Sequence, residues 1–341
     1  GGRLGTQGRR VGHHPPLQTL RKAQLQPGGG RRQPHEAHEH CHEAAVRSAV
    51  PAGLHRGNDR LDGRRWTDAV SRSQKRKGRC AGEGMKSTKI GESASMDYIR
   101  VTKENIDREH ICCAMSGKQS LAKKEWLKQR FEEGLVFYRS AERGKCFIEY
   151  IPAENAWVPI DAAGWLYINC LWVSGSLKGH GYSSDLLEEC LRDARAQGKN
   201  GVCILCAEGR KREFLADSKF LTHKGFKVSD ISDCGINLMY LPLAESARPP
   251  KFKDCAKHPK VEENGFVLYY TDQCPYTYYW VPKVQEVAKE HGIPFKAVHI
   301  TEKETAQNVP APVTTYALFR DGKFVTQSIQ SDKKFLKLAA E

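Results

Sequence analysis

Residues 165–207 constrain the fold most strongly, because they show the pattern of a strand, a glycine-rich turn, a helix and a second strand. Residues 165–173 are rich in aromatic and β-branched side chains, which favour strands. Apolar residues then recur at helical spacing, at Leu186, Leu187, Cys190, Leu191 and Ala194. Gly198 is placed to end this helix, and the apolar run 202–206 is typical of a strand covered on both faces. The segment predicts a right-handed crossover in an α/β domain.

The turn between the first strand and the helix has the sequence Lys178-Gly179-His180-Gly181-Tyr182-Ser183. Because glycines have no side chains, several backbone N–H groups can point at one place, at the positive end of the following helix. Such a group of donors binds a diphosphate. An ordinary loop is the alternative, and the position directly after a strand favours the diphosphate site.

This turn resembles the acetyl-CoA loop of the GNAT acyltransferase family, which has the form Arg or Gln, two residues, Gly, one residue, Gly or Ala. Lys178, Gly181 and Ser183 fill the three places. Lysine keeps the charge without the guanidinium fork, and serine is small enough for the backbone to approach a ligand. The resemblance implies a GNAT fold, with a mixed β-sheet and flanking helices, and acetyl-CoA as co-substrate. It also implies that the backbone of Leu171, Trp172 and Val173 pairs with the pantetheine arm.

The resemblance further implies that an amine attacks the thioester directly in a ternary complex, with a backbone N–H of the first strand stabilising the oxyanion. A protonated amine must first lose a proton. We name Glu149 as the base and Glu154 as the second candidate, with a solvated surface carboxylate as the alternative for each. Leu221 stands where many members carry a tyrosine that protonates the leaving thiolate, so water or another group must supply that proton.

Three other residue patterns near this unit carry less chemistry. We expect the ring of His180 to point outward while its backbone serves the loop. Cys203 and Cys206 have Cys-x-x-Cys spacing, but strand periodicity places them on opposite faces, as core thiols. Cys255 and His258 lack two further ligands. We therefore predict no metal site.

We place the acetyltransferase domain at residues 96–243, a linker or docking strap at 244–264 and a second domain at 265–341. In the first domain, the remaining predicted strands are 98–101, 135–138 and 146–151, and the predicted helices run from 102 toward 115, over 121–133 and up to Gly225. In the second domain, the predicted strands are 266–270, 295–300, 315–319 and 324–327, and the predicted helices are 275–291 and 332–338.

The second domain resembles a thioredoxin-like α/β fold, because Cys274-Pro275-Tyr276 opens a helix and Pro282 falls where thioredoxins kink theirs. Pro312 is the candidate cis-proline. A cysteine at a helix start has a stabilised thiolate, which makes Cys274 a candidate functional thiol. Thr277 replaces the second cysteine of the dithiol motif. Together with Ala306-Gln307-Asn308, these residues make the chain similar to bacterial-type acetyltransferases with a YoaP-like C-terminal domain.

Residues 1–84 differ in composition from the rest of the chain. They contain 17 of the 54 Lys and Arg residues but 7 of the 40 Asp and Glu residues, and Trp66 is their one aromatic residue. Such a sequence cannot bury enough apolar surface to offset chain entropy, so we predict a disordered basic tail over 1–95. Upstream sequence read in frame before a native start at Met85 or Met96 is favoured over organellar targeting or an RNA-binding arm.

The rest of the chain is close to charge balance, with 37 Lys and Arg residues against 33 Asp and Glu residues, which disfavours a nucleic-acid-binding body outside the tail. No stretch approaches the roughly 18 apolar residues of a membrane span, and the 12 cysteines show no disulfide-type spacing. We expect a soluble, cytoplasmic N-acetyltransferase that acts on a small-molecule or peptide amine. The rival function is thiol exchange or thiol binding through Cys274, with the first domain sensing acyl-CoA. Leu221 leaves a non-catalytic interaction module as a third function.

Overall fold

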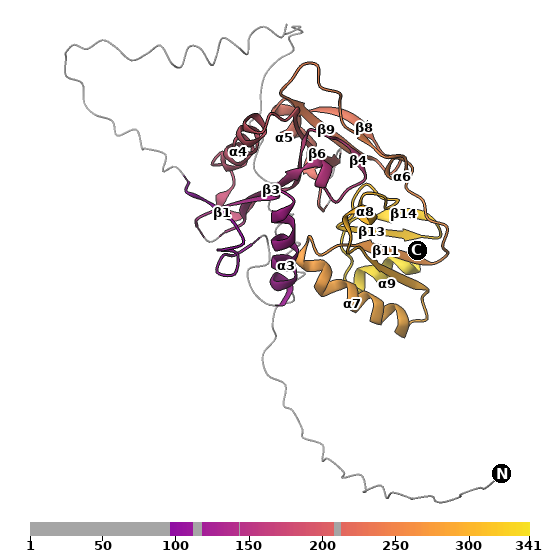
Figure 1. Ribbon diagram of the computed structural model, residues 1–341. Coiled ribbons are helices and arrows are strands. Elements are labelled where there is room, and N and C mark those ends of the chain that lie inside the picture. Colours follow the sequence, from indigo (N-terminus) through magenta and orange to yellow (C-terminus); the bar gives the residue numbers. More distant parts are fainter. Residues whose placement is uncertain (1–95, 112–117, 143, 208–212) are drawn as a thin grey trace, which may run out of the picture.

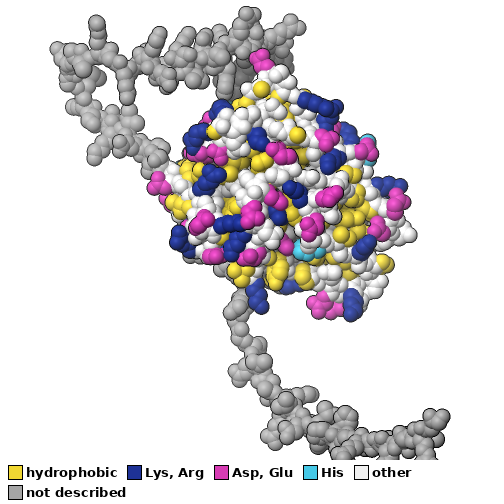
Figure 2. All heavy atoms as spheres, viewed as in Figure 1, with side chains coloured by type: hydrophobic (Ala, Val, Ile, Leu, Met, Phe, Trp, Pro, Cys, Tyr) yellow, Lys and Arg dark blue, Asp and Glu magenta, His cyan; other side chains and the backbone are white. Residues whose placement is uncertain are grey.

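The computed structural model describes residues 96–111, 118–142, 144–207 and 213–341 (Figure 1). The predictions for residues 1–95, and for the end of the helix expected up to residue 115, lie outside these ranges. Within them, no helix combines the length and the apolar character needed to cross a bilayer. On the face shown in Figure 2, acidic and basic side chains are interspersed, in line with the near balance of charge after residue 84.

The first domain is built on an eight-stranded mixed sheet with the strand order β1-β2-β3-β5-β6-β9-β8 and β7 beside β6. The parallel pairs are β5 with β6 and β6 with β7, and the other neighbours are antiparallel. The strands are β1 (Tyr98–Val101), β2 (Val136–Ser140), β3 (Cys146–Pro152), β5 (Leu166–Val173), β6 (Gly201–Ala207), β7 (Ala216–Asp217), β8 (Lys227–Ile231) and β9 (Ile236–Pro242).

Helices cover both faces of this sheet, as the apolar strand β6 requires. On one face, α4 (Tyr182–Ala196) and α5 (Ser218–His223) pack on the sheet through buried residues that include Leu187 and Leu221. On the other face, α3 (Lys118–Glu132) contributes Trp126 and Leu127 to a second apolar cluster. The sheet therefore has an α4 face and an α3 face.

The second domain has a four-stranded sheet with the order β12-β11-β13-β14. Helix α7 connects the parallel strands β11 and β12, and an antiparallel hairpin follows. The elements are β11 (Phe266–Tyr270), α7 (Pro275–Glu290), β12 (Phe295–His299), α8 (Lys303–Ala306), β13 (Tyr316–Arg320), β14 (Lys323–Thr326) and α9 (Asp332–Ala340).

The second domain packs on the α3 face of the first. Helices α3 and α7 are in contact (Figure 1), and Val267 and Phe319 belong to the same buried cluster as Trp126. A polar contact also joins the two domains: Gln307 Nε2 donates to the carbonyl of Ala156 at 2.9 Å. The two sheets thus share one apolar core.

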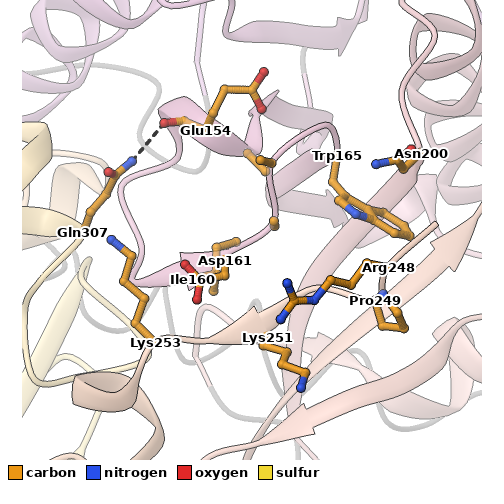
Figure 3. A pocket seen from close by; sticks show the side chains of 13 residues that line it. Glu154, Ile160, Asp161, Trp165, Asn200, Arg248, Pro249, Lys251, Lys253 and Gln307 are labelled. Atoms are coloured by element: carbon orange, nitrogen blue, oxygen red, sulfur yellow. Dashed lines mark hydrogen bonds between the residues drawn. The ribbon is translucent and has the colours of Figure 1, made fainter.

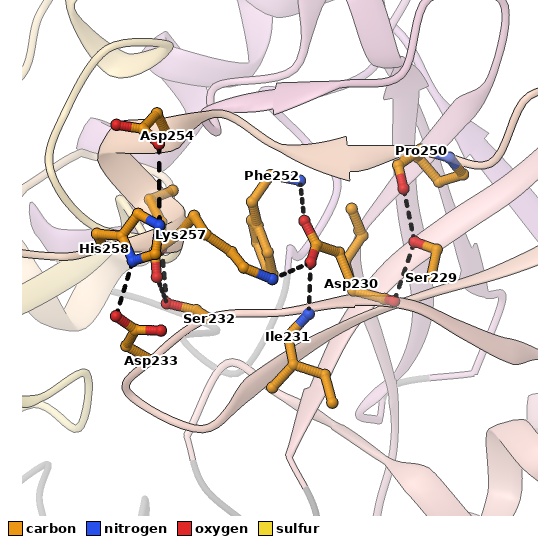
Figure 4. Close-up of polar contacts among 12 residues, drawn as sticks. Ser229, Asp230, Ile231, Ser232, Asp233, Pro250, Phe252, Asp254, Lys257 and His258 are labelled. Carbon is orange, nitrogen blue, oxygen red and sulfur yellow. Dashed lines mark hydrogen bonds and ion pairs between the residues drawn. The ribbon is translucent and has the colours of Figure 1, made fainter.

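Residues 244–264, which we call the strap, join the two domains along the first sheet. Strand β10 (Lys251–Phe252) pairs with β4 (Ile160–Asp161), and α6 (Asp254–Lys257) follows. The carboxylate of Asp230 on β8 accepts the N–H of Phe252 at 3.0 Å and is ion-paired with Lys257 (Figure 4). The strap is therefore docked rather than loose, one of the two forms expected for it.

The predicted helix starting at residue 102 is wrong over its described part, because residues 102–109 form turns. The side chain of Asn105 accepts the N–H of Thr102 at 2.8 Å and donates to the carbonyl of Arg100. These two bonds hold the turns against the end of β1. No element was predicted at β4, β7, β8, β9, β10, α6 and α8, five of which are two to four residues long.

The network around Asp230 predicts a pH-dependent contribution to stability. Partial burial raises the pKa of Asp230. Hydrogen bonds from Lys257 and from the N–H groups of Phe252 and Ile231 outweigh that effect and lower the pKa below its ordinary 3.8. Because the folded-state pKa is depressed, this stabilisation is present above about pH 4 and is lost as the pH falls through the folded value. We expect Asp230→Asn to lower Tm at pH 7 by about 2 to 4 °C.

Thermal scans of the wild type and Asp230→Asn between pH 7 and pH 3 check this. The difference in Tm should narrow below about pH 4, and a constant difference down to pH 3 contradicts the assignment. Asp233→Asn is the control, because the Asp233 side chain is 64% exposed and pairs with His258 at the surface.

Candidate active site

The central feature of the first sheet is an opening between β5 and β6. The two strands pair only at Leu166, Tyr167 and Ile168, opposite Val202, Cys203 and Ile204. Beyond this point β7 takes the edge of β6, at Cys206 and Ala207. Among the described residues, β5 thus has no sheet partner on this side from residue 169 to residue 173. The backbone of these residues forms one wall of a cleft.

A β-bulge marks the place where β5 leaves β6. On the other side of β5, Tyr150 pairs with Ile168 and Glu149 pairs with Cys170, so Asn169 is the extra residue. A bulge bends its strand and increases the local twist. It therefore accounts for the divergence of β5 from β6 one residue after their last pair.

The glycine-rich loop closes the cleft at the C-terminal end of β5. A hollow of about 210 Å³ is lined by Val173, Lys178 to Gly179, Gly181 to Ser184, Leu177 and Phe220. Gly179 and Gly181 have φ of +81° and +87°, and no atom lies within 4 Å of the position where a Cβ would stand. Helix α4 begins at Tyr182, so the N–H groups of Tyr182 and Ser183 come before its first backbone hydrogen bond, from Ser184 to the carbonyl of Gly181. The loop is therefore an open cradle of donors before α4, and it fits a diphosphate.

His180 and the Cys-x-x-Cys pair lie as the sequence predicts. His180 is exposed, its Nε2 lies 3.1 Å from the carbonyl of Ser176, and its ring stacks on Tyr182. Cys203 faces the core on the α3 face and Cys206 the core on the α4 face. In the part of the chain that the structure describes, no three His, Cys, Asp or Glu side chains group as metal ligands would.

Glu149 lies on β3, one strand from the cleft, and it is buried. Its Oε2 is 2.7 Å from Lys123 Nζ, and its Oε1 accepts from the side-chain amide of Asn169 at 2.9 Å. The Lys123 and Glu149 side chains are 1% and 2% exposed. Glu149 is thus no solvated surface carboxylate. It connects α3 to the bulge residue at the mouth of the cleft.

Glu154 lies elsewhere. It belongs to the short helix η1 (Ala153–Asn155), beyond the end of β3 where Pro152 pairs with Leu166. The glycine-rich loop follows the other end of β5. The seven residue steps of strand from Leu166 to Val173 separate the two ends by about 23 Å. Partial burial raises the pKa of Glu154, but the hydrogen bond from Lys199 at 2.8 Å outweighs it, and the pKa is lowered. Of the two predicted bases, only Glu149 neighbours the cleft.

Three residues near the cleft were missed by sequence reasoning: Lys123, Asn169 and Phe220. Asn169 could have been found from the sequence, because it is a polar amide within the otherwise apolar strand 165–173. Lys123 had none, because it lies among other lysines of α3. Phe220 lines the hollow, whereas its neighbour Leu221 is buried in the core under α5.

Cys274 is the N-cap of α7 and is partly exposed. Pro275 follows at the first helical position, and Pro282 lies inside the helix. The hydroxyl of Thr277 donates to the carbonyl of Thr271 at 2.8 Å. Thr277 therefore fixes the start of the helix rather than serving as a second redox group.

Comparisons with known proteins agree with this architecture. The acetyltransferase (GNAT) family matches residues 104–212, and the YoaP-like family matches residues 294–337. The chain is 45% identical over 247 residues to the uncharacterized N-acetyltransferase YoaP of Bacillus subtilis (strain 168), covering 71% of this chain and 98% of the relative.

The chain belongs to the GNAT acetyltransferase family, a family of acyltransferases. Within it, the chain shares with its Bacillus subtilis relative nearly the whole length of that protein, and its C-terminal domain is YoaP-like.

Solved structures resemble the chain more distantly. A GNAT family acetyltransferase from Brucella melitensis in complex with acetyl-CoA is 14% identical, with a TM-score of 0.31, over 47% of this chain and 97% of that one. The putative acetyltransferase yncA from Salmonella typhimurium, with acetyl-CoA, is 16% identical, with a TM-score of 0.33, over 45% and 97%. These scores are too low to carry an argument.

The buried pair of Lys123 and Glu149 predicts a clear pattern of stability. Lys123→Met leaves a buried carboxylate without its cation and should lower the free energy of unfolding by about 3 to 5 kcal/mol. Lys123→Met combined with Glu149→Leu removes both charges and should recover most of that loss. Urea unfolding followed by tryptophan fluorescence measures both variants. A double variant no more stable than the single one contradicts this account.

Proposed function

We propose that this chain is an N-acetyltransferase that transfers acetyl from acetyl-CoA to an amine by direct attack in a ternary complex. The observation that carries the proposal is the cleft. Its wall is the part of β5 that has parted from β6, which begins at the bulge of Asn169 and ends at an open cradle of N–H groups before α4. Membership of an acetyltransferase family supports acyl transfer as the reaction.

The donor would lie along β5 with its diphosphate in the loop. The N–H groups of residues 179–183 and the positive end of α4 suit two phosphate charges. Lys178 adds a cation at the same hollow. The backbone of Leu171, Trp172 and Val173 offers donors and acceptors to the amides of the pantetheine arm. The thioester then lies near residues 169 and 170, where the strands separate.

In the reaction the amine nitrogen bonds to the thioester carbonyl carbon, and the carbon–sulfur bond breaks to release the thiolate of CoA. A backbone N–H of β5 stabilises the negative charge that develops on the carbonyl oxygen. We assign to Glu149 the proton that the acceptor ammonium loses. It is the one carboxylate on β3 and β5, and its register partner Cys170 lies in the part of β5 that has parted from β6. With Leu221 buried, water protonates the leaving thiolate.

The second domain, in our proposal, forms the far wall of the acceptor site. It packs on the α3 face, the same face on which Glu149 meets Lys123. We propose that it has a thioredoxin-like arrangement without a dithiol, which is supported by the parallel strands β11 and β12 on either side of α7 and by the hairpin that follows. The acceptor is then a small-molecule or peptide amine that reaches the cleft along the domain seam.

Thiol exchange or thiol binding through Cys274 is the second candidate function. The supporting observation is that Cys274 caps α7 and is partly exposed, where the helix dipole stabilises a thiolate. In this alternative the first domain binds acyl-CoA as a sensor.

Isothermal titration calorimetry with acetyl-CoA tests the cradle. Gly181→Glu places a negative side chain among the N–H donors and should weaken binding by about 100-fold, for a loss of about 3 kcal/mol in charge-assisted contacts. Gly198→Glu is the matched control, because Gly198 follows the other end of α4, with φ of +62° and no atom within 4 Å of its Cβ position. Equal affinities of the two variants would refute the cradle.

A screen of amines, amino acids and peptides with a free-thiol readout tests the chemistry. On the best acceptor, Glu149→Gln should lower kcat by about 10²-fold or more, as loss of a general base does. Acetyl-CoA affinity should be kept, because glutamine has the same shape and its carbonyl oxygen can still accept a hydrogen bond from Lys123. Glu154→Gln and Cys274→Ser should leave the rate unchanged. If Cys274→Ser abolishes turnover and Glu149→Gln does not, the thiol alternative replaces the proposal.

A further inference from the structure

A second hollow lies at the opposite end of β5 from the glycine-rich loop. It has a volume of about 330 Å³ and is enclosed by the first domain, the strap and the end of α8 (Figure 3). Ala163 and Pro249 supply exposed apolar surface, Trp165 and Ile160 lie buried beneath it, and Asn200 and Gln307 supply amides. This size suits a small metabolite. Nothing in the proposed acetyl transfer uses these residues.

The strap directs basic side chains at this hollow. Arg248, Lys251 and Lys253 all line it. Between the two lysines, Phe252 is 5% exposed and belongs to the apolar core, while its N–H is held by Asp230 at 3.0 Å (Figure 4). Because side chains alternate along an extended chain, anchoring Phe252 on one side turns Lys251 and Lys253 to the other. Their placement therefore follows from how the strap is docked.

The charges around the hollow are unbalanced. Of the two acids that line it, Glu154 is already paired with Lys199 at 2.8 Å, outside the set of lining residues. Asp161 lies between Arg248 and Lys253 in Figure 3, but within the described ranges no ion pair joins it to a cation of the strap. Three cations thus face one carboxylate. An anion in the hollow would relieve their mutual repulsion.

We infer that this hollow binds a small organic anion through a carboxylate or phosphate group, with Arg248, Lys251 and Lys253 as its cationic ligands. The guanidinium fork of Arg248 can hold two oxygens at once, and the lysines act as point charges. The side-chain amide of Asn200 remains for the rest of the ligand. The site is distinct from the coenzyme cradle, because β5 separates them by about 23 Å.

Binding here would join three parts of the molecule. The strap supplies the cations, the first domain supplies Asn200, and the end of α8 is already fixed by Gln307, its C-cap, to the carbonyls of Glu154 and Ala156. An anion held between them secures the strap against the first sheet. The ligand therefore stabilises the domain junction at a place remote from the cleft.

Calorimetry on the full chain at constant ionic strength, with inorganic phosphate and with succinate as separate probes, tests the inference. We expect at least one probe to bind. Arg248→Gln with Lys253→Gln should weaken that binding at least tenfold. Asp161→Asn should tighten it severalfold, since it removes a repelling carboxylate. Binding of phosphate alone assigns a phosphate ligand, and binding of succinate alone assigns a carboxylate ligand.

The matched control is Lys289→Gln with Lys333→Gln, which removes the same charge from exposed positions of the second domain. This control should bind the probe as the wild type does. Absence of heat with both probes overturns the inference, as does equal weakening in the two double variants. Acetyl-CoA affinity should be unchanged in Arg248→Gln with Lys253→Gln. The anion site and the coenzyme cradle are therefore tested independently.

Discussion

The contact of Glu149 with Lys123 and Asn169 is the interaction on which the cleft depends. It ties α3, β3 and the bulge of β5 together in an interior where both charges are almost fully removed from water. A buried ion pair contributes little net stability, but each partner is costly to leave alone. The pair therefore restricts how α3 can sit on the sheet. Because Asn169 is the bulge residue, the same contacts fix the point at which β5 parts from β6.

The shared apolar core makes the second domain part of this arrangement. Trp126 of α3 packs edge to face on Trp157, and the hydroxyl of Thr314 donates to the carbonyl of Trp157 from the second domain. Separating the domains would expose this core and leave that buried carbonyl without its donor. The two domains consequently behave as one folding unit on the α3 face, whereas the α4 face belongs to the first domain alone.

The sequence was sufficient where the signal is local. The strand, turn, helix and strand of residues 165–207 were placed to within a residue or a few, because apolar periodicity and glycines report directly on backbone geometry. Predictions from the sequence failed where the structure depends on contacts between residues far apart in the chain. Lys123 and Glu149 are 26 positions apart, and no local pattern reveals that they meet. The polar composition of the strap hid β10, whose pairing depends on β4, about 90 residues earlier. At residue 102 the helical pattern was present, but the chain forms turns there, and the side chain of Asn105 holds them against the end of β1.

The second domain also reaches the other side of the cleft. After β6, Glu213 accepts the N–H of Ile329 at 2.7 Å, and Phe214 packs between the two domains with a φ of +64°, a conformation unfavourable for a bulky residue. The chain then forms β7 in the gap between β5 and β6, and Asp217 caps α5 through the N–H of Phe220 at 3.0 Å. Phe220 lines the hollow of about 210 Å³ at the glycine-rich loop. The segment that ends one wall of the cleft is thus held in a strained conformation by contacts to the second domain. Those contacts connect the YoaP-like domain to Phe220 and so to the hollow at the glycine-rich loop.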